Sequence, residues 1–243
     1  MKIVVVIPTY NERANIELLI HALEEQFISI DYNMAILVVD DNSPDGTSDC
    51  VLALMRTRAN LSLLTGEKRG LGVARTRGMQ YALRELQAEA IIEMDADFSH
   101  KPEDVPRLIA ALEAGGDFVI GSRYVKGGKI PDNWGHLRKA LSRWGNICAR
   151  YLAGLYRVRD CTTGFRAIRA SLLRQIDFRN LTVRGYAFHI VLLNQAMLLQ
   201  GALWEIPVEF IDRERGATKL GLSDIIEFLI NVFWIRFRRA GRS

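Results

Sequence analysis

Residues 3–8, IVVVIP, set the fold class, because a five-residue apolar run closed by a proline is typical of a strand buried on both faces of a parallel sheet. Comparable apolar runs recur at 35–39, 61–64, 90–94 and 118–121, with segments of helical apolar spacing between them. This alternation predicts an α/β fold, in which a parallel sheet is covered by helices on both faces. Ligands of such sheets bind beyond the carboxyl ends of the strands.

The composition is that of an ordinary globular protein. The 243 residues are 49% hydrophobic and 25% charged, and we expect a single domain over residues 1–243. The three cysteines, Cys50, Cys148 and Cys161, form no CxxC pair, which argues against a disulfide framework or a structural zinc site. The amino-terminal apolar run is too short for a signal peptide, and no run is long enough for a transmembrane helix. We therefore expect a cytoplasmic protein.

Positive charge is concentrated in the second half of the chain. Residues 1–120 carry 11 basic and 19 acidic side chains, a net −8, whereas residues 121–243 carry 21 and 9, a net +12. A basic half suggests an anionic partner, which can be a nucleic acid, phosphate groups or an acidic membrane surface. The simpler alternative is a set of scattered, solvated arginines.

Two predicted helices in the basic half, at 137–155 and 223–239, have broad apolar surfaces bordered by basic residues. Such helices can lie in a membrane interface with arginines at the headgroups, or they can be core helices with cationic ends. Two of them in one basic half favour peripheral contact with an anionic membrane. The aromatic side chains alternate with aliphatic ones and form no stacking platform, which argues against nucleic acid. The side chains expected at the membrane are Trp144, Tyr151, Phe233, Trp234, Phe237, Arg138, Lys139, Arg236, Arg238 and Arg239.

Acidic pairs follow two of the predicted strands. Asp95-Ala96-Asp97 comes directly after the apolar strand at 91–94, and two carboxylates one residue apart can bind a divalent cation together with water and substrate phosphates. Most such pairs are simply loop or cap residues. Asp40-Asp41 ends another strand, so both pairs should meet at one edge of the sheet. One of these two aspartates can cap the next helix, while the other can accept hydrogen bonds from a base or ribose.

Several common catalytic and nucleotide-binding signatures are missing from the sequence. The glycine-rich segment 66–72 contains no GxxxxGK[ST], and Arg75 stands where GxGxxG requires its third glycine. The sequence shows no Ser/His/Asp arrangement. The four histidines, which have no ligand spacing and are interpreted as surface or packing residues, are His21, His100, His136 and His189.

Six short motifs occur in an order that resembles a known family. They are PTYNE at 8–12, DDNSPDGT at 40–47, DAD at 95–97, GSRY at 121–124, TGFR at 163–166, and DR at 212–213 followed by KL at 219–220. Together they resemble the polyprenol (dolichyl) phosphate mannosyltransferases of glycosyltransferase family 2, over about residues 2 to 237. The resemblance implies a GT-A type nucleotide-binding sheet covered by helices. It also implies inverting transfer of mannose from GDP-mannose to a polyprenyl phosphate. Because such an acceptor stays in the bilayer, we expect the cytoplasmic protein to act on the cytoplasmic face of a membrane.

The resemblance also implies the site residues. The donor would contact Pro8, Tyr10, Glu12, Val39, Asp41, Asp95, Ala96, Asp97, Arg123, Arg213 and Lys219. Among these, the residues expected to be catalytic are Asp97, Arg123, Arg213 and Lys219. Mg²⁺ or Mn²⁺ would bind at Asp95 and Asp97, with Ser99 as a third position where some relatives have glutamine.

The chemistry agrees with a site that has no obvious catalytic histidine. A phosphate monoester has a second pKa near 6, so a polyprenyl phosphate is largely dianionic at neutral pH and needs no protein base. Arg213 and Lys219, on the polar segment 212–219, would add positive charge at the leaving diphosphate. An alternative donor is UDP-glucose or another sugar nucleotide. A processive polysaccharide synthase fits less well, because Ala140 stands where its QxxRW motif needs glutamine.

Overall fold

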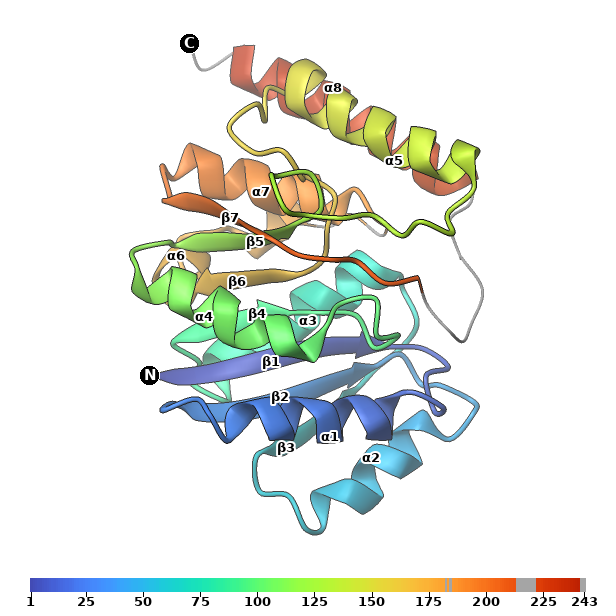
Figure 1. Ribbon diagram of the computed structural model, residues 1–243, viewed down its shortest axis with the longest axis vertical. Helices are drawn as coiled ribbons and strands as arrows, with labels where there is room; N and C mark the ends of the chain where they lie inside the picture. Colours follow the sequence, from blue (N-terminus) through green and yellow to red (C-terminus); the bar gives the residue numbers. More distant parts are fainter. Residues whose placement is uncertain (182, 184, 213–221, 241–243) are drawn as a thin grey trace.

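A seven-stranded sheet forms the centre of the molecule (Figure 1). The computed structural model describes residues 1–181, 183, 185–212 and 222–240. The strand order is β3-β2-β1-β4-β6-β5-β7. The strands are β1 (Lys2–Thr9), β2 (Asn33–Asp40), β3 (Leu61–Thr65), β4 (Ala90–Glu93), β5 (Phe118–Ser122), β6 (Arg166–Arg169) and β7 (Leu203–Pro207).

Helices cover both faces of this sheet. The helices are α1 (Ile16–Phe27), α2 (Thr47–Met55), α3 (Leu71–Arg84), α4 (Val105–Glu113), α5 (His136–Ile147), α6 (Ala170–Leu173), α7 (Phe188–Leu198) and α8 (Leu222–Ala240). Short 3₁₀ segments lie at η1 (Pro102–Asp104) and η3 (Phe178–Leu181), and a π-helical turn, η2, spans Cys148–Leu152.

The two faces of β1 enter two separate hydrophobic cores, as its apolar sequence predicts. Ile3, Val5 and Ile7 pack with α1, α2 and α4 on one face. Val4 and Val6 pack with α3 and α7 on the other face. Because successive side chains of a strand alternate between faces, an unbroken apolar run is what a strand covered on both sides requires.

The sheet is mixed, whereas the sequence predicted a parallel one. The strands β1 to β4 pair in parallel, but β6 runs antiparallel to both of its neighbours, β4 and β5. The chain leaves β5 through α5 and η2, then returns at the carboxyl edge and enters β6 from that side, so the strand must run backwards. Neither β6 nor β7 was predicted from the sequence, because both are short and lie in the half without clear alternation.

The helices α5 and α8 lie side by side outside α7, at one end of the molecule (Figure 1). The predicted helix at 137–155 is an α-helix only to Ile147 and continues as the π-helical turn η2. On α8, Val232 and Ile235 are buried in the core, while Phe233 and Trp234 are more than half exposed. One side of α8 is thus part of the core, as the core-helix alternative expects, and the other is exposed, so its contact with a membrane stays a prediction. No helix in the described ranges combines the length and apolar character needed to cross a bilayer.

Candidate active site

A cavity of about 740 Å³ opens at the carboxyl edge of the sheet, where the parallel strands β1, β2 and β4 end. Residues from three of the predicted motifs line it together: Pro8, Tyr10, Glu12, Asp41, Asp95, Ala96 and Asp97. The segment from Lys68 to Leu71, at the start of α3, forms another part of the wall. The neighbouring strand ends explain why motifs distant in sequence meet here.

Not every predicted donor residue lies on this cavity. The side chain of Val39 is buried in the core, where a Cβ placed on Gly78 would lie 2.7 Å from Val39 Cγ2. Only its backbone, beside Pro8 in the sheet register, is near the site. Arg213 and Lys219 lie outside the described residues, so their contact with phosphates stays a prediction.

The two aspartates at the end of β2 have different surroundings. Asp40 accepts hydrogen bonds from Thr9 Oγ1 at 2.8 Å and from the Ser43 amide at 2.8 Å, so it organises the turn and does not cap α2. Asp41 lines the cavity and accepts a hydrogen bond from Arg77 Nη2 at 3.0 Å. Burial raises the pKa of the Asp41 carboxyl, against the opposing effect of Arg77. Asp41 is thus the one of the two aspartates that faces the cavity.

The segment 95–100 is held by its own side chains. The Ser99 amide donates to Asp97 Oδ1 at 3.1 Å, and the Ser99 hydroxyl donates to the same oxygen. The Asp95 amide donates to Nδ1 of His100 at 3.0 Å, and the His100 ring stacks on Phe165 with centroids 4.9 Å apart. Because His100 is buried, its pKa is lowered and the ring stays neutral. The histidine predicted to pack does so, and it also orders the aspartate loop.

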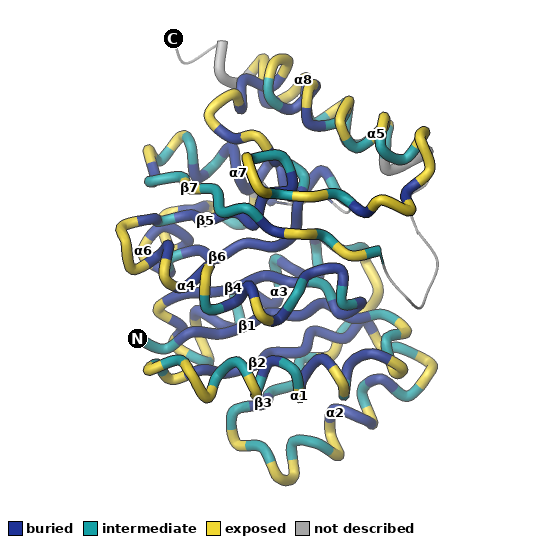
Figure 2. Tube along the Cα trace, viewed as in Figure 1, coloured by how far each residue is buried: buried dark blue, intermediate teal, exposed yellow. Residues whose placement is uncertain are grey.

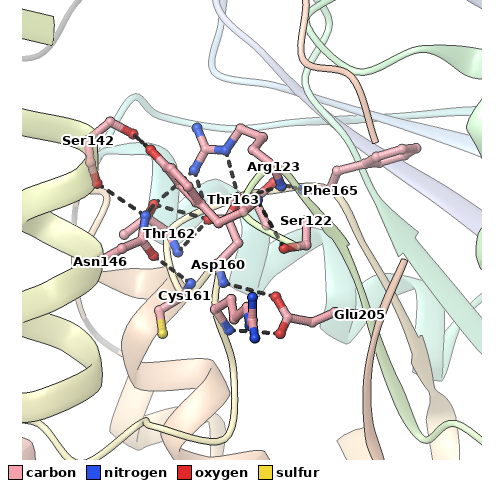
Figure 3. A network of polar contacts seen from close by, with 12 residues as sticks. Ser122, Arg123, Ser142, Asn146, Asp160, Cys161, Thr162, Thr163, Phe165 and Glu205 are labelled. Atoms are coloured by element: carbon pink, nitrogen blue, oxygen red, sulfur yellow. Dashed lines mark hydrogen bonds and ion pairs between the residues drawn. The ribbon is translucent and has the colours of Figure 1, made fainter. Parts of the chain in front are cut away.

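Arg123 is paired with Asp160 (Figure 3) and is not among the residues that line the cavity. Its Nε donates to Asp160 Oδ2 at 2.7 Å, and its Nη2 donates to Asp160 Oδ1 at 2.8 Å and to Thr162 Oγ1 at 3.0 Å. Both side chains are buried. Although burial acts in the opposite direction, Arg123 holds the pKa of Asp160 below its ordinary value. In this arrangement Arg123 joins the end of β5 to the loop before β6, and its predicted contact with phosphate or sugar stays a prediction.

Arg75 is a site residue that sequence reasoning missed. Its side chain is fully buried, with Nη1 3.1 Å from Glu93 Oε1 and Nη2 2.5 Å from Asp95 Oδ1. Asp95 and Glu93 hold the pKa of Arg75 above its ordinary value, although burial alone would lower it. The sequence did contain a sign of this role. Arg75 has helical spacing with Gly78, Met79 and Ala82 on the buried face of α3, where an apolar residue is expected.

Comparison with known proteins identifies the family. The model of glycosyl transferase family 2 matches residues 4–177. The chain belongs to glycosyltransferase family 2. It is 39% identical to a polyprenol monophosphomannose synthase of Mycolicibacterium smegmatis, over 94% of this chain and 84% of that protein. It is 37% identical to an undecaprenyl-phosphate mannosyltransferase of Micrococcus luteus, over 96% and 93%, and 34% identical to a dolichol-phosphate mannosyltransferase of Pyrococcus furiosus, over 96% and 63%.

Solved structures of glycosyltransferases share the fold of this family-2 enzyme. Glucosyl-3-phosphoglycerate synthase of Mycobacterium tuberculosis, crystallised with Mn²⁺, UDP and glucosyl-3-phosphoglycerate, superposes with a TM-score of 0.70 at 20% identity, covering 99% of this chain and 80% of that one. Mannosyl-3-phosphoglycerate synthase of Rubrobacter xylanophilus superposes with a TM-score of 0.71 at 18% identity, covering 100% and 76%. The predicted GT-A type sheet is therefore confirmed.

The donor set of this glycosyltransferase fits a hard divalent cation. Asp95 and Asp97 both face the cavity and offer carboxylate oxygens, which Mg²⁺ and Mn²⁺ prefer. Within the described ranges, no cluster of three or more His, Cys, Asp or Glu side chains could hold a metal without other ligands. A cation here would therefore take its remaining ligands from water and substrate phosphates. The Ser99 hydroxyl orients Asp97, and its predicted role as a third ligand stays a prediction.

Proposed function

We propose that this glycosyltransferase moves mannose from GDP-mannose to a polyprenyl phosphate and inverts the anomeric carbon. The observation that carries the proposal is the gathering of Tyr10, Asp41, Asp95 and Asp97 on one cavity, from motifs that the mannosyltransferase resemblance assigns to the donor. The choice of mannose and of a polyprenyl acceptor is supported by the three relatives named for those substrates, at 34% to 39% identity.

The cavity suits a sugar nucleotide in size and chemistry. Its volume of about 740 Å³ falls in the usual range for small-molecule sites. The Asp41 carboxylate can accept hydrogen bonds from the N–H groups of a guanine base or from ribose hydroxyls. The Lys68 ammonium lies 3.5 Å from the centroid of the Tyr10 ring and, like Arg69, stands on the cavity wall, where it offers positive charge to a diphosphate.

Asp95 and Asp97 would hold Mg²⁺ or Mn²⁺ beside the donor diphosphate. When bound, the cation supplies Lewis acidity that stabilises negative charge on the departing diphosphate. Ser99 keeps Asp97 in place through two hydrogen bonds to one carboxylate oxygen. Arg213 and Lys219 are proposed to add positive charge at the same group.

The acceptor phosphate is already a nucleophile. An oxygen of the phosphate dianion forms the new bond to the anomeric carbon while the bond from that carbon to the diphosphate breaks, so the configuration inverts. No protein group needs to remove a proton. The two buried histidines agree with this, because His100 and His189 are each 2% exposed and are not among the residues that line the cavity.

We further propose that residues 1–243 act as one catalytic domain that binds peripherally to the anionic, cytoplasmic face of a membrane through α5, η2 and α8. Figure 2 shows exposed positions along the outer sides of these elements. The membrane surface, as we define it, consists of Leu137, Leu141, Trp144, Ile147, Tyr151, Leu152, Ile226, Ile230, Phe233, Trp234 and Phe237, each at least 40% exposed. An acceptor that stays in the bilayer gives such a surface its purpose.

The basic residues of this region are partly engaged within the protein. Arg138 donates to Asp212 Oδ1 at 2.8 Å and stacks over Trp134 at 3.9 Å. Arg236 is exposed at the end of α8 and can meet lipid phosphates. The side chains of Arg238 and Arg239 lie outside the described residues.

Transfer of radiolabelled sugar to lipid tests the proposal. The purified protein is incubated with polyprenyl phosphate and labelled GDP-mannose or UDP-glucose, with Mg²⁺, Mn²⁺ or excess chelator. We expect lipid-linked label from GDP-mannose that depends on the cation. Preferential transfer from UDP-glucose would overturn the donor, and full activity in chelator would overturn the metal. Transfer to water alone would overturn the acceptor.

A further inference from the structure

A buried arginine connects the core of the molecule to the wall of the cavity. One arm of the Arg75 guanidinium contacts Glu93, which is 1% exposed at the end of β4. The other arm contacts Asp95, whose side chain is 34% exposed and lines the cavity. A single rigid group thus joins a fully buried carboxylate to one that meets the donor.

Stability alone does not account for this arrangement. Burying charges is costly, and a buried ion pair is often no more stable than apolar residues of similar volume. A planar guanidinium, however, holds two donors at a fixed angle, which a lysine ammonium cannot do. A guanidinium fixed by Glu93 can therefore hold the Asp95 carboxylate in one orientation.

The loop before β6 encloses the arginine from a third side. The Gly164 carbonyl accepts from Arg75 Nη1 at 3.4 Å. A Cβ on Gly164 would lie 2.7 Å from Arg75 Nη2 and 3.1 Å from His189 Cε1, so a larger residue would displace the guanidinium. The glycine of the TGFR motif is explained by this close approach.

We propose that Arg75 is a positioning residue, which holds the Asp95 carboxylate in the orientation that binds the divalent cation and donor diphosphate, with Glu93 as its buried counter-charge. This inference rests on the proposed function of Asp95. Groups that orient a metal-binding side chain typically change metal affinity or activity about 10- to 100-fold when they are removed.

Arg166 provides a matched control. It is also fully buried and lies opposite Glu93 in the sheet register, but its Nη1 and Nη2 donate to the backbone carbonyls of His189 and Cys161, each at 2.9 Å. Replacing either arginine with methionine removes a buried cation of the same size. Arg75→Met removes the contact with Asp95, whereas Arg166→Met removes a buried cation next to Glu93 and leaves the contact of Arg75 with Asp95 in place.

The test measures GDP binding by calorimetry over a range of Mn²⁺ concentrations and in chelator, together with the Mn²⁺ dependence of turnover. For Arg75→Met we expect the Mn²⁺ concentration for half-maximal turnover to rise about 10-fold or more, and the gain in GDP affinity from Mn²⁺ to fall similarly. In chelator the GDP affinity of Arg75→Met should stay within about threefold of the wild-type value, because no cation is bound and the orientation of Asp95 toward it has no effect. Equal shifts in Arg166→Met would overturn the proposal.

Two further variants keep the test decisive if Arg75→Met does not fold. Arg75→Lys keeps the positive charge but loses the planar pair of donors, and Arg75→Met with Glu93→Gln removes both charges of the Arg75–Glu93 pair. Either folded variant with wild-type Mn²⁺ dependence would overturn the inference, whereas a raised Mn²⁺ requirement supports it. Asp95→Asn separates the two proposals. Wild-type turnover in Asp95→Asn would overturn the proposed site itself. If Asp95→Asn loses turnover but Arg75→Lys keeps the wild-type Mn²⁺ dependence, only the role of Arg75 is overturned.

Discussion

Replacing Asp160 with asparagine should strongly destabilise this glycosyltransferase. The Asp160 carboxylate accepts hydrogen bonds from the Arg123 amide at 3.0 Å, from its Nε at 2.7 Å and from its Nη2 at 2.8 Å. In Asp160→Asn, the new amide group faces donors of Arg123, and the buried cation loses its counter-charge. Removing one partner of a buried ion pair typically costs about 3–5 kcal/mol, a large part of a total stability of about 5–15 kcal/mol.

Thermal and urea unfolding measure this effect. For a chain of this size each kcal/mol lowers Tm by about 2–4 °C, so the expected decrease in Tm is about 6–20 °C. A double variant, Arg123→Met with Asp160→Leu, should recover much of the loss, because no unpaired charge remains buried. A decrease below about 1 kcal/mol in Asp160→Asn would refute the reasoning, since only an exposed pair costs so little.

The pH dependence of stability gives an independent check. Because the pKa of Asp160 is lower in the folded than in the unfolded protein, its contribution is fully present above the unfolded value of about 3.9 and is lost as the pH falls through the folded value. The difference in unfolding free energy between the wild type and Asp160→Asn should therefore be constant near neutral pH and shrink below about pH 4. A difference that grows on acidification would contradict the assigned ion pair.

The remaining predictions concern activity and membrane binding. Asp97→Asn should lower turnover about 100-fold or more with little change in Tm, because asparagine keeps the shape of the side chain but lacks the negative charge that binds the cation. Wild-type turnover in this variant would contradict the proposed metal site. Ser99→Ala, which removes one hydrogen bond to Asp97, should lower kcat/KM only about 2- to 10-fold. Trp234→Ser should weaken binding to anionic vesicles about 10-fold, while Trp204→Ser, an exposed tryptophan on β7, should leave it unchanged, and equal effects would contradict the membrane surface. Arg213→Ala should reduce turnover whatever its effect on Tm, so wild-type kinetics would remove Arg213 from the site.

The first half of the fold and most of the residues that line the cavity could be predicted from the sequence. The apolar runs of β1, β2 and β4 are local signals, because a strand buried on both faces must be apolar throughout. Parallel strands bring their carboxyl ends to one edge, so the acidic residues after β2 and β4 had to meet. Asp41, Asp95 and Asp97 were therefore expected at one edge of the sheet, and the structure has them lining one cavity there.

Only the tertiary structure decided which partners the arginines take. Arg75 pairs with residues 18 and 20 positions away, and Arg123 pairs with Asp160, 37 positions away. The pairing of Arg123 with Asp160 depends on the reversed direction of β6, which brings residues 160–166 back to the carboxyl edge of the sheet. Periodicity and turn chemistry act over a few residues and carry no information on strand direction after a long excursion. The chain sequence therefore determines which groups stand at the edge of the sheet, and long-range packing determines which of them are held by buried charges.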